Sequence, residues 1–319
     1  EIDGDKIKVS VELGFPAKGA QEAIASAVRE QVEAVDGVGS CDVDVSWKIV
    51  AHSVQKALKP IDNVKNIIAV ASGKGGVGKS TTAVNLALAL AAEGARVGIL
   101  DADIYGPSQP RMLGVSGKPE SKDGQSLEPM QAWHLQAMSI GFLIDEETPM
   151  IWRGPMVTQA LEQLLNDTNW DELDYLVIDL PPGTGDTQLT LAQKVPVSGA
   201  IVVTTPQDIA LLDARKGFKM FEKVEVPVLG IVENMSIHIC SQCGHEEHMA
   251  EQYGVDFLGG LPLDIRIREE TDGGKPTVVA EPDSRISEIY REIARKAAAT
   301  LSQQAKSYAA KFPNIVIQN

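Results

Sequence analysis

The pattern of hydrophobic and polar positions divides the chain into two parts. Residues 6–13 (KIKVSVEL) and 41–50 (CDVDVSWKIV) alternate polar with apolar residues, which is typical of strands that bury one face. Between them, residues 19–35 carry isoleucine and valine at helical spacing. The pattern predicts a small β-α-β unit at the start of the chain. Because this unit opens abruptly, we expect further sequence to precede residue 1.

The second part has short, continuous apolar runs. The run IIAVAS (67–72) is typical of a strand buried on both faces of a parallel sheet, and a helix is predicted from about Gly78 to Glu93. Further strands are predicted at residues 96–100, 175–180, 199–205 and 228–234. Helices are predicted between the later strands, at residues 187–194 and 208–222. This alternation predicts an α/β fold with a doubly wound, mostly parallel sheet of the P-loop type. A β-rich excursion is expected over 123–142, and one long amphipathic helix over 284–311.

These patterns give three segments. We predict a small N-terminal α+β domain over residues 1–52, a linker over 53–65, and a large domain over 66–319. The linker is polar and contains Pro60.

The sequence GKGGVGKST (73–81) lies between the first predicted strand of the large domain and its first helix, and it matches the phosphate-binding pattern G-x-x-x-x-G-K-[ST]. Its glycines let backbone N–H groups approach phosphate oxygens, and the helix N-terminus adds partial positive charge. Lys79 is expected to neutralise phosphate charge, and the Ser80 hydroxyl to bind Mg²⁺. The alternative is a glycine-rich turn that only ends a strand. The predicted ATP-binding residues of this loop are Gly73, Lys74, Gly75, Gly76, Val77, Gly78, Lys79, Ser80 and Thr81.

An acidic residue ends a later apolar strand. In YLVIDLPPGTGD, Asp179 occupies the Walker B position, where it is expected to hold Mg²⁺ directly or through water. Residues Gly183 to Asp186 then form a predicted switch loop near the terminal phosphate.

Composition narrows the range of functions. The formal net charge of −15 argues against nonspecific nucleic-acid binding, which needs concentrated lysine and arginine. No apolar run approaches the roughly 20 residues that cross a bilayer. The chain has 3 cysteines, which do not make a disulfide framework and fit a reducing, cytoplasmic environment.

Two of these cysteines, Cys240 and Cys243, stand at C-x-x-C spacing in CSQCGHEEH. A pair alone cannot fill a four-coordinate metal site. One alternative is an in-chain zinc site with His245 and His248, although so short a loop wraps a tetrahedron poorly. Others are a zinc site of four cysteines shared by two subunits, a redox pair, and a structural turn.

Several segments resemble known families. Lys74, directly after the first loop glycine, is typical of the deviant P-loop that MinD, ParA and the nitrogenase iron protein share. Four longer segments resemble the Mrp/ApbC family of iron–sulfur cluster carrier ATPases, from about Asn66 to Arg295: LDADIYGPSQPRMLG, IWRGPMVTQALEQLL, DYLVIDLPPGTGDTQLTL and VENMSIHICSQCG. The N-terminal unit fits the domain often fused ahead of these ATPases, but it lacks the cysteine that commonly follows the first strand there. We interpret Cys41 as a small core residue.

The resemblance implies roles for individual residues. Lys74 would reach across a homodimer interface to the partner's nucleotide. Asp101 would lie near Mg²⁺, Asp103 would orient the attacking water, and Asn234 would contact adenine. Cys240 and Cys243 from each of two subunits would together hold one [4Fe–4S] cluster.

The expected protein is therefore a cytoplasmic, homodimeric ATPase that hydrolyses ATP slowly, receives a cluster from a scaffold or donor protein and passes it to apo-proteins. No nucleic acid and no membrane are expected as partners. One alternative is a MinD/ParA-like positioning ATPase that attaches reversibly to membrane or nucleoid, yet the last predicted helix mixes charges and the tail FPNIVIQN has no basic residue. Another is an electron-transferring reductase like the nitrogenase iron protein, which takes its cysteines from two separate loops.

Overall fold

The computed structural model of the chain describes residues 2–55, 58–144, 154–236 and 256–305. Its larger sheet has eight strands in the order β11-β10-β9-β4-β8-β5-β7-β6. All neighbouring strands pair in parallel except β6 and β7, which are antiparallel. The strand bounds are β4 (Val64–Ser72), β5 (Val97–Asp101), β6 (Met130–Ala132), β7 (Leu135–Ser139), β8 (Leu173–Asp179), β9 (Gly199–Thr204), β10 (Val228–Glu233) and β11 (Phe257–Gly260). The predicted doubly wound, mostly parallel α/β fold is confirmed.

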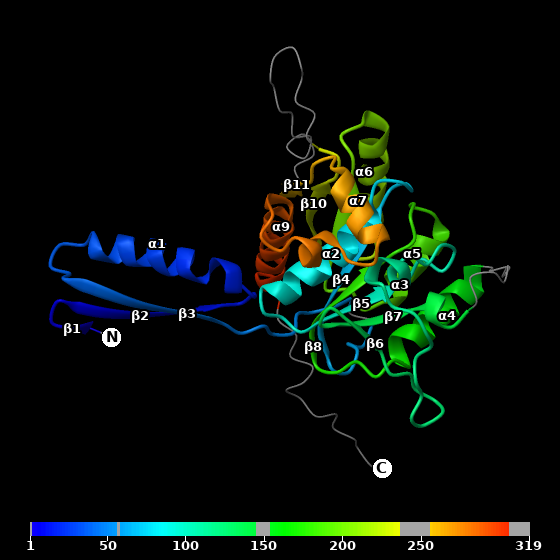
Figure 1. Cartoon of the computed structure of the whole chain (residues 1–319), viewed down its shortest axis with the longest axis horizontal. Helices are drawn as coiled ribbons and strands as arrows, with labels where there is room; N and C mark the ends of the chain where they lie inside the picture. The colour runs from blue at the N-terminus through cyan, green and yellow to red at the C-terminus, as the bar shows by residue number, and fades with distance from the viewer. Residues whose placement is uncertain (1, 56–57, 145–153, 237–255, 306–319) are drawn as a thin grey trace.

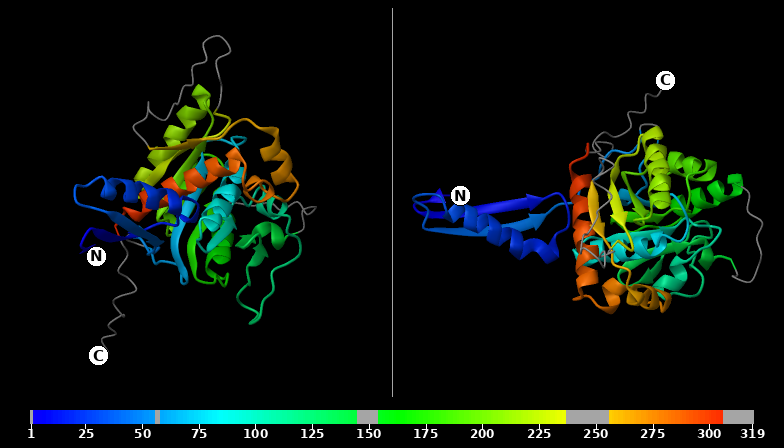
Figure 2. Two further views of the ribbon diagram at one scale, coloured as in Figure 1. Left: turned by 60° about the vertical axis from the view of Figure 1, so that its left-hand side comes forward. Right: turned by 90° about the horizontal axis from the view of Figure 1, so that it is seen from above.

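Helices cover both faces of this sheet. The chain runs from β4 to β5 in one direction along the sheet, but from β7 to β8, β8 to β9 and β9 to β10 in the other. Because such crossovers are right-handed, α2 lies on one face, with α9 beside it, and α4, α5 and α6 lie on the opposite face (Figure 2). The helix bounds are α2 (Lys79–Ala92), α3 (Gln109–Leu113), α4 (Gly154–Asn166), α5 (Asp186–Lys194), α6 (Asp208–Lys223), α7 (Ile265–Asp272), α8 (Thr277–Ala280) and α9 (Arg285–Ser302), with a 3₁₀ turn, η2, at Ile140–Phe142.

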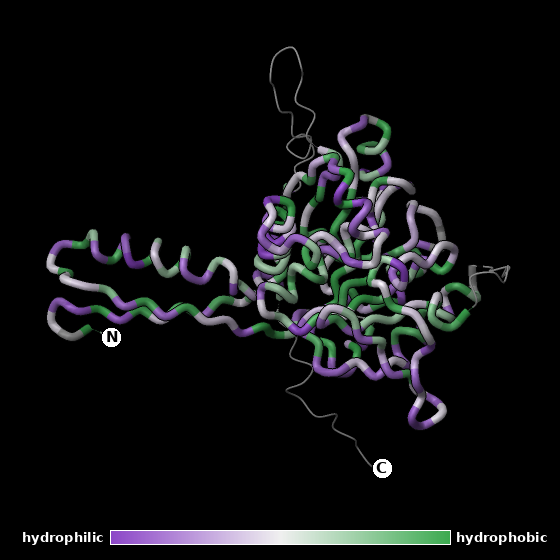
Figure 3. Tube along the Cα trace, in the orientation of Figure 1, coloured by the Kyte–Doolittle hydropathy of each residue, from purple (hydrophilic) through white to green (hydrophobic). Residues whose placement is uncertain are grey.

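The central strands are apolar because both of their faces are covered. Every residue of β5, β8 and β9 is buried, and so is every residue of β4 except Lys65. Figure 3 shows this as a concentration of hydrophobic segments inside the larger part of the molecule. Burial on both sides explains why the sequence shows continuous runs here instead of alternation.

The smaller sheet is built differently. It has the order β1-β2-β3, with β1 (Ile2–Asp3) antiparallel and β3 (Ser40–Trp47) parallel to β2 (Lys6–Leu13). Helix α1 (Gln21–Glu33), preceded by the 3₁₀ turn η1 (Lys18–Ala20), covers its apolar face. Cys41 lies in this small core and is 6% exposed, as predicted.

The small unit extends from the side of the larger one, next to α9 (Figure 1). The side chain of Glu93, just after α2, accepts hydrogen bonds from the backbone N–H of Gly19 at 2.8 Å and from Arg295 of α9 at 2.7 Å. The Trp47 ring packs so close to Gly94 that a Cβ there would collide with it. The two units therefore meet at the C-terminal end of α2.

Several element boundaries differ from the prediction by a few residues, as at the end of β3, which is Trp47 instead of residue 50. Strand β4 begins at Val64, because the side-chain amide of Asn66 donates to the carbonyls of Val50 and Asp174 and so is tolerated inside a buried strand. The last helix was predicted to reach residue 311, which lies outside the described residues, but it ends at Ser302. Beyond it the carbonyl of Ala305 accepts from the backbone N–H of Ser53 at 2.8 Å. The domain and linker boundaries themselves stay a prediction.

No described helix combines the length and the apolar character that crossing a bilayer requires.

Candidate functional site

The phosphate-loop motif lies where the direction of winding changes. It follows β4 and leads into α2, at the carboxyl edge of the sheet between strands that connect to opposite sides. This is the position at which open α/β sheets bind ligands. Gly76 and Gly78 have φ angles of 81° and 80°, in the left-handed region that favours glycine.

Two loop glycines are also required by close neighbours. A Cβ at Gly73 would overlap the backbone of Asp213 in α6, and one at Gly78 would overlap the side-chain amide of Asn234. The loop is thus held between α6 and the end of β10. Gly75 and Gly76 have open space around them, and Val77 is buried.

Lys79 and Asp179 form a buried ion pair. The Lys79 side chain is 6% exposed and the Asp179 side chain is fully buried, and the ammonium donates to Oδ1 of Asp179. The same ammonium donates to the Ser80 hydroxyl at 3.1 Å. The structure therefore brings together the three residues that the sequence assigns to phosphate and Mg²⁺.

Gln109 is a member of this cluster that sequence reasoning missed. Its Nε2 donates to Oδ2 of Asp179 at 2.9 Å and to the backbone carbonyl of Ser80 at 3.1 Å, so it connects two of the three residues predicted near Mg²⁺. It lies in the GPSQP stretch of a segment that the resemblance covered, but no local pattern marks a glutamine at the start of α3 as part of a metal site.

Asp101 organises the loop that follows β5. Its carboxylate accepts backbone N–H groups from Asp103 at 3.1 Å, Ser108 at 2.9 Å and Gln109 at 3.0 Å, and the Ser139 hydroxyl at 3.2 Å. Burial, and then the negative charge of Asp179, raise the pKa of Asp101 from 3.8 to about 7, against the opposing effect of these hydrogen bonds and Lys79. Near neutral pH this carboxyl is therefore poised between its two charge states.

Asp103 lies two residues after Asp101, in the loop that follows β5, and is half-buried. Burial raises its pKa above 3.8, the positive charge of Lys79 opposes the shift, and the negative charge of Asp179 adds to it. The charges of Lys79 and Asp179 therefore act on the carboxyl of Asp103 as they do on that of Asp101.

A cavity of about 590 Å³ opens beside the loop. Asn234 is on its wall, with its Nδ2 donating to the Val77 carbonyl at 2.9 Å and its Oδ1 accepting from the backbone N–H of Met235 at 3.0 Å. The other lining residues are Gly76, Gly78, Thr81, Met235, Pro262, Leu263, Asp264, Ile265, Ile267 and Arg268. The segment LPLD (261–264) and the start of α7 supply part of this wall.

Two groups of predicted residues are not brought into this cluster. Lys74 is half-exposed, and its carbonyl accepts from the Ser72 hydroxyl at 2.9 Å; its role concerns a second subunit and stays a prediction. The cysteines Cys240 and Cys243, with His245 and His248, lie outside the described residues.

The fold and the loop define the class of a P-loop nucleotide-binding protein with a doubly wound sheet. Residues 63–298 match the family described as NUBPL iron-transfer P-loop NTPase, and residues 1–45 match the family described as iron–sulfur cluster assembly protein. The chain belongs to the NUBPL iron-transfer P-loop NTPase family.

Relatives and solved structures agree with this assignment. The chain is similar to the iron–sulfur cluster carrier protein of Pseudomonas fragi, with 60% identity over 82% of this chain and 94% of the relative. It is also similar to that of Escherichia coli K12, with 53% identity over 95% of this chain and 85% of the relative. A nucleotide-binding protein from Archaeoglobus fulgidus, solved with ADP, is 38% identical with a TM-score of 0.60 over 72% of this chain and 93% of that one. The cell division ATPase MinD of Pyrococcus furiosus, at 24% identity and a TM-score of 0.56 over 72% of this chain and 97% of that one, shares the fold.

Proposed function

We propose that this protein is an ATP-dependent iron–sulfur cluster carrier that holds a [4Fe–4S] cluster between two copies of the chain and passes it to apo-proteins. The observation that carries the proposal is the buried Lys79–Asp179–Ser80 cluster at the phosphate loop of a chain whose relatives are named as cluster carriers. The cysteine count fits a reducing, cytoplasmic setting.

Nucleotide binding would exchange the partners of the buried ion pair. The Lys79 ammonium would turn from Asp179 to the phosphate oxygens of ATP, and Asp179 would turn to Mg²⁺. A buried charge is costly without a partner, so each exchange requires the other. This arrangement makes binding of ATP and of Mg²⁺ interdependent.

The available donors fit Mg²⁺. The Ser80 hydroxyl and the Asp179 carboxylate are oxygen ligands of the kind that this ion prefers. Asp101 lies close enough to Asp179 that the negative charge of Asp179 raises the pKa of Asp101. When bound, Mg²⁺ supplies positive charge that stabilises the transferred phosphoryl group. Gln109 would keep Asp179 and the Ser80 backbone in place, and Asp103 would orient the attacking water.

The cluster is cargo in this scheme. Cys240 and Cys243 of each subunit would provide two thiolates, so that two subunits supply the four that a [4Fe–4S] cluster takes. Lys74 of one subunit would approach the nucleotide of the other and stabilise charge that develops during slow hydrolysis. Donor proteins would load the dimer, and apo-proteins would unload it.

Anaerobic reconstitution with iron and sulfide tests this proposal. We expect one four-iron cluster per dimer in the unchanged protein, and loss of bound iron in Cys243→Ala. Cys41→Ala is the matched control, because Cys41 is buried in the small core and should leave iron binding unchanged. Iron retained in Cys243→Ala would defeat the cysteine assignment, and a loaded dimer that activates no apo-enzyme would defeat the carrier role.

A further inference from the structure

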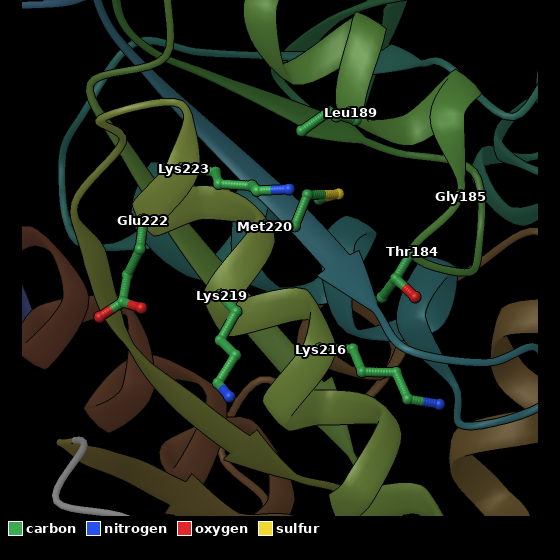
Figure 4. Close-up of a pocket in the computed structure, with 8 residues that line it drawn as sticks. All are labelled: Thr184, Gly185, Leu189, Lys216, Lys219, Met220, Glu222 and Lys223. Carbon is green, nitrogen blue, oxygen red and sulfur yellow. The ribbon is translucent and has the colours of Figure 1, made fainter.

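A second cavity, of about 760 Å³, lies between α6 on one side and α5 with the loop before it on the other (Figure 4). We call it the α5–α6 groove. Its lining residues are Thr184, Gly185, Leu189, Lys216, Lys219, Met220, Glu222 and Lys223. None of them belongs to the nucleotide cavity, so the groove is a separate feature of the surface.

The charge of the groove is opposite to that of the chain. Three lysines and one glutamate give its lining a formal charge of +2, whereas the chain carries −15. Lys219 and Lys223 form no ion pair with any residue in the ranges that the structure describes. Lys216 pairs with Asp213 at 2.9 Å but stays 65% exposed. In Figure 4 the carboxylate of Glu222 points away from Leu189 and Met220.

The spacing of the lysines indicates the shape of the ligand. Lys216, Lys219 and Lys223 follow each other at intervals of three and four residues on α6, so they share one face. Seven residues of helix span about 10 Å. Charges spread over this distance suit several carboxylates along a segment better than they suit one phosphate group.

The groove also has apolar side chains. Met220, which is 6% exposed, and the half-buried Leu189 come from the two opposite walls. A ligand that matches both features combines acidic residues with an apolar side chain, as amphipathic protein segments do. Nucleic acid fits less well, because three lysines on a chain of charge −15 are a weak basis for phosphate binding.

We propose that the α5–α6 groove binds an acidic, amphipathic segment of a protein that delivers the cluster or receives it. The identification of this partner rests on the proposed function, but the binding chemistry does not. Carboxylates of the segment contact Lys216, Lys219 and Lys223, and an apolar side chain contacts Met220 and Leu189. Thr184 and Gly185 belong to the predicted switch loop, so the groove is placed where the nucleotide state can alter it.

Binding of a labelled peptide to the full chain tests the proposal. The probe is a short fluorescent peptide with glutamates and leucines at helical spacing, and its affinity is measured by anisotropy. We expect Lys219→Glu with Lys223→Glu to weaken binding by about tenfold or more, because attraction becomes repulsion. The matched control is Lys6→Glu with Lys118→Glu, which changes the net charge equally at exposed positions outside the groove and should change affinity by less than about twofold.

Further arms separate the alternatives. A peptide with glutamine in place of glutamate should not bind, and affinity should fall between about 50 and 200 mM salt. Equal binding by the two double variants would overturn the proposal. So would equal competition by tripolyphosphate or DNA, which would indicate a general anion site, and so would a change of the dimer–monomer equilibrium in the groove variant, which would indicate a second copy of the chain as the occupant.

A last arm distinguishes this inference from the proposed function. The variant Cys240→Ala with Cys243→Ala should lose bound iron and still bind the peptide. The groove variant, Lys219→Glu with Lys223→Glu, should lose peptide binding and keep bound iron and ATP hydrolysis. It should transfer its cluster to an acidic apo-protein more slowly. Unchanged transfer by the groove variant would refute the assignment of the partner, whatever the outcome for the cysteines.

Discussion

The two sheets of this molecule are built on opposite principles. The central strands of the large sheet are buried on both faces, and Asp101 and Asp179 stand at the carboxyl ends of two of them. Strands of the small sheet bury one face against α1 and expose the other, so β3 alternates between exposed and buried residues. Figure 3 shows the contrast as continuous hydrophobic segments in one part and alternating colours in the other.

This difference determines what charges can do in each unit. At the edge of the large sheet, Lys79, Asp101 and Asp179 are buried, so their charges interact strongly, and burial raises the pKa of Asp101. On the open face of the small sheet, residues such as Lys6, Asp42 and Asp44 are exposed, so solvent and salt screen them. Chemistry that depends on electrostatics is therefore expected only in the large unit.

The strongest test of the comparison removes the buried cation. Lys79→Ala should reduce ATP hydrolysis by about 10²–10³-fold, because it deletes a group that neutralises phosphate charge in a site with little water. Turnover of ATP at saturating Mg²⁺ measures this. The control is Lys65→Ala, which removes a lysine of the same strand-to-loop segment whose partner is Asp174 and whose side chain is 47% exposed.

Hydrolysis by Lys65→Ala should stay within about twofold of the unchanged protein, since Lys65 lies near the start of β4, at the opposite end of the strand from the phosphate loop, and pairs with Asp174. Circular dichroism must show that Lys79→Ala is folded, because Asp179 loses its partner. An active, folded Lys79→Ala would contradict the assignment of the loop.

The second test concerns the junction of the two units. The carboxylate of Glu93, with a side chain 1% exposed, receives the N–H of Gly19 from the small unit and the guanidinium of Arg295 from α9. Glu93→Gln keeps the shape but removes the charge, so we expect a loss of roughly 1.5–3 kcal/mol in the free energy of unfolding, the value typical of charge-assisted hydrogen bonds. Urea unfolding, followed separately by tryptophan fluorescence and by far-UV dichroism, measures it.

A matched control uses an exposed pair. Glu172→Gln breaks the ion pair with Arg96, but the Glu172 side chain is 73% exposed. Its effect should stay within about 0.5 kcal/mol. If the two variants lose equal stability, burial is not what distinguishes the junction.

The sequence predicted those parts of the site that are local in the chain. The strand, the glycine-rich loop and the helix of residues 67–93 are contiguous, so their order alone predicts Lys79 and Ser80 as neighbours of a phosphate site. Asp179 follows from the same logic, because it ends a buried strand.

Features that depend on distant contacts were not predicted. Gln109 becomes part of the site only because the loop after β5 folds back on Asp101, which binds three of its backbone N–H groups. The start of β4 was missed because Asn66 looks unfavourable in a strand until Val50 and Asp174 supply acceptors for its amide. The chain after α9 meets a residue far away in the sequence, because the carbonyl of Ala305 accepts from Ser53.

The last and smallest effect concerns pH and sharpens the contrast between buried and exposed carboxyls. Because the folded-state pKa of Asp101 is raised from 3.8 to about 7, its contribution to stability is fully present below about pH 4 and is lost as pH rises through 7. Mg²⁺ favours the charged carboxylate, so Mg²⁺-dependent ATP binding should tighten by about tenfold from pH 6 to pH 8 and release a proton. Calorimetry in buffers of different ionisation enthalpy measures both. Asp44→Asn, on the exposed face of β3, should leave the profile unchanged, whereas a flat profile in the unchanged protein would show that Asp101 does not respond to the metal.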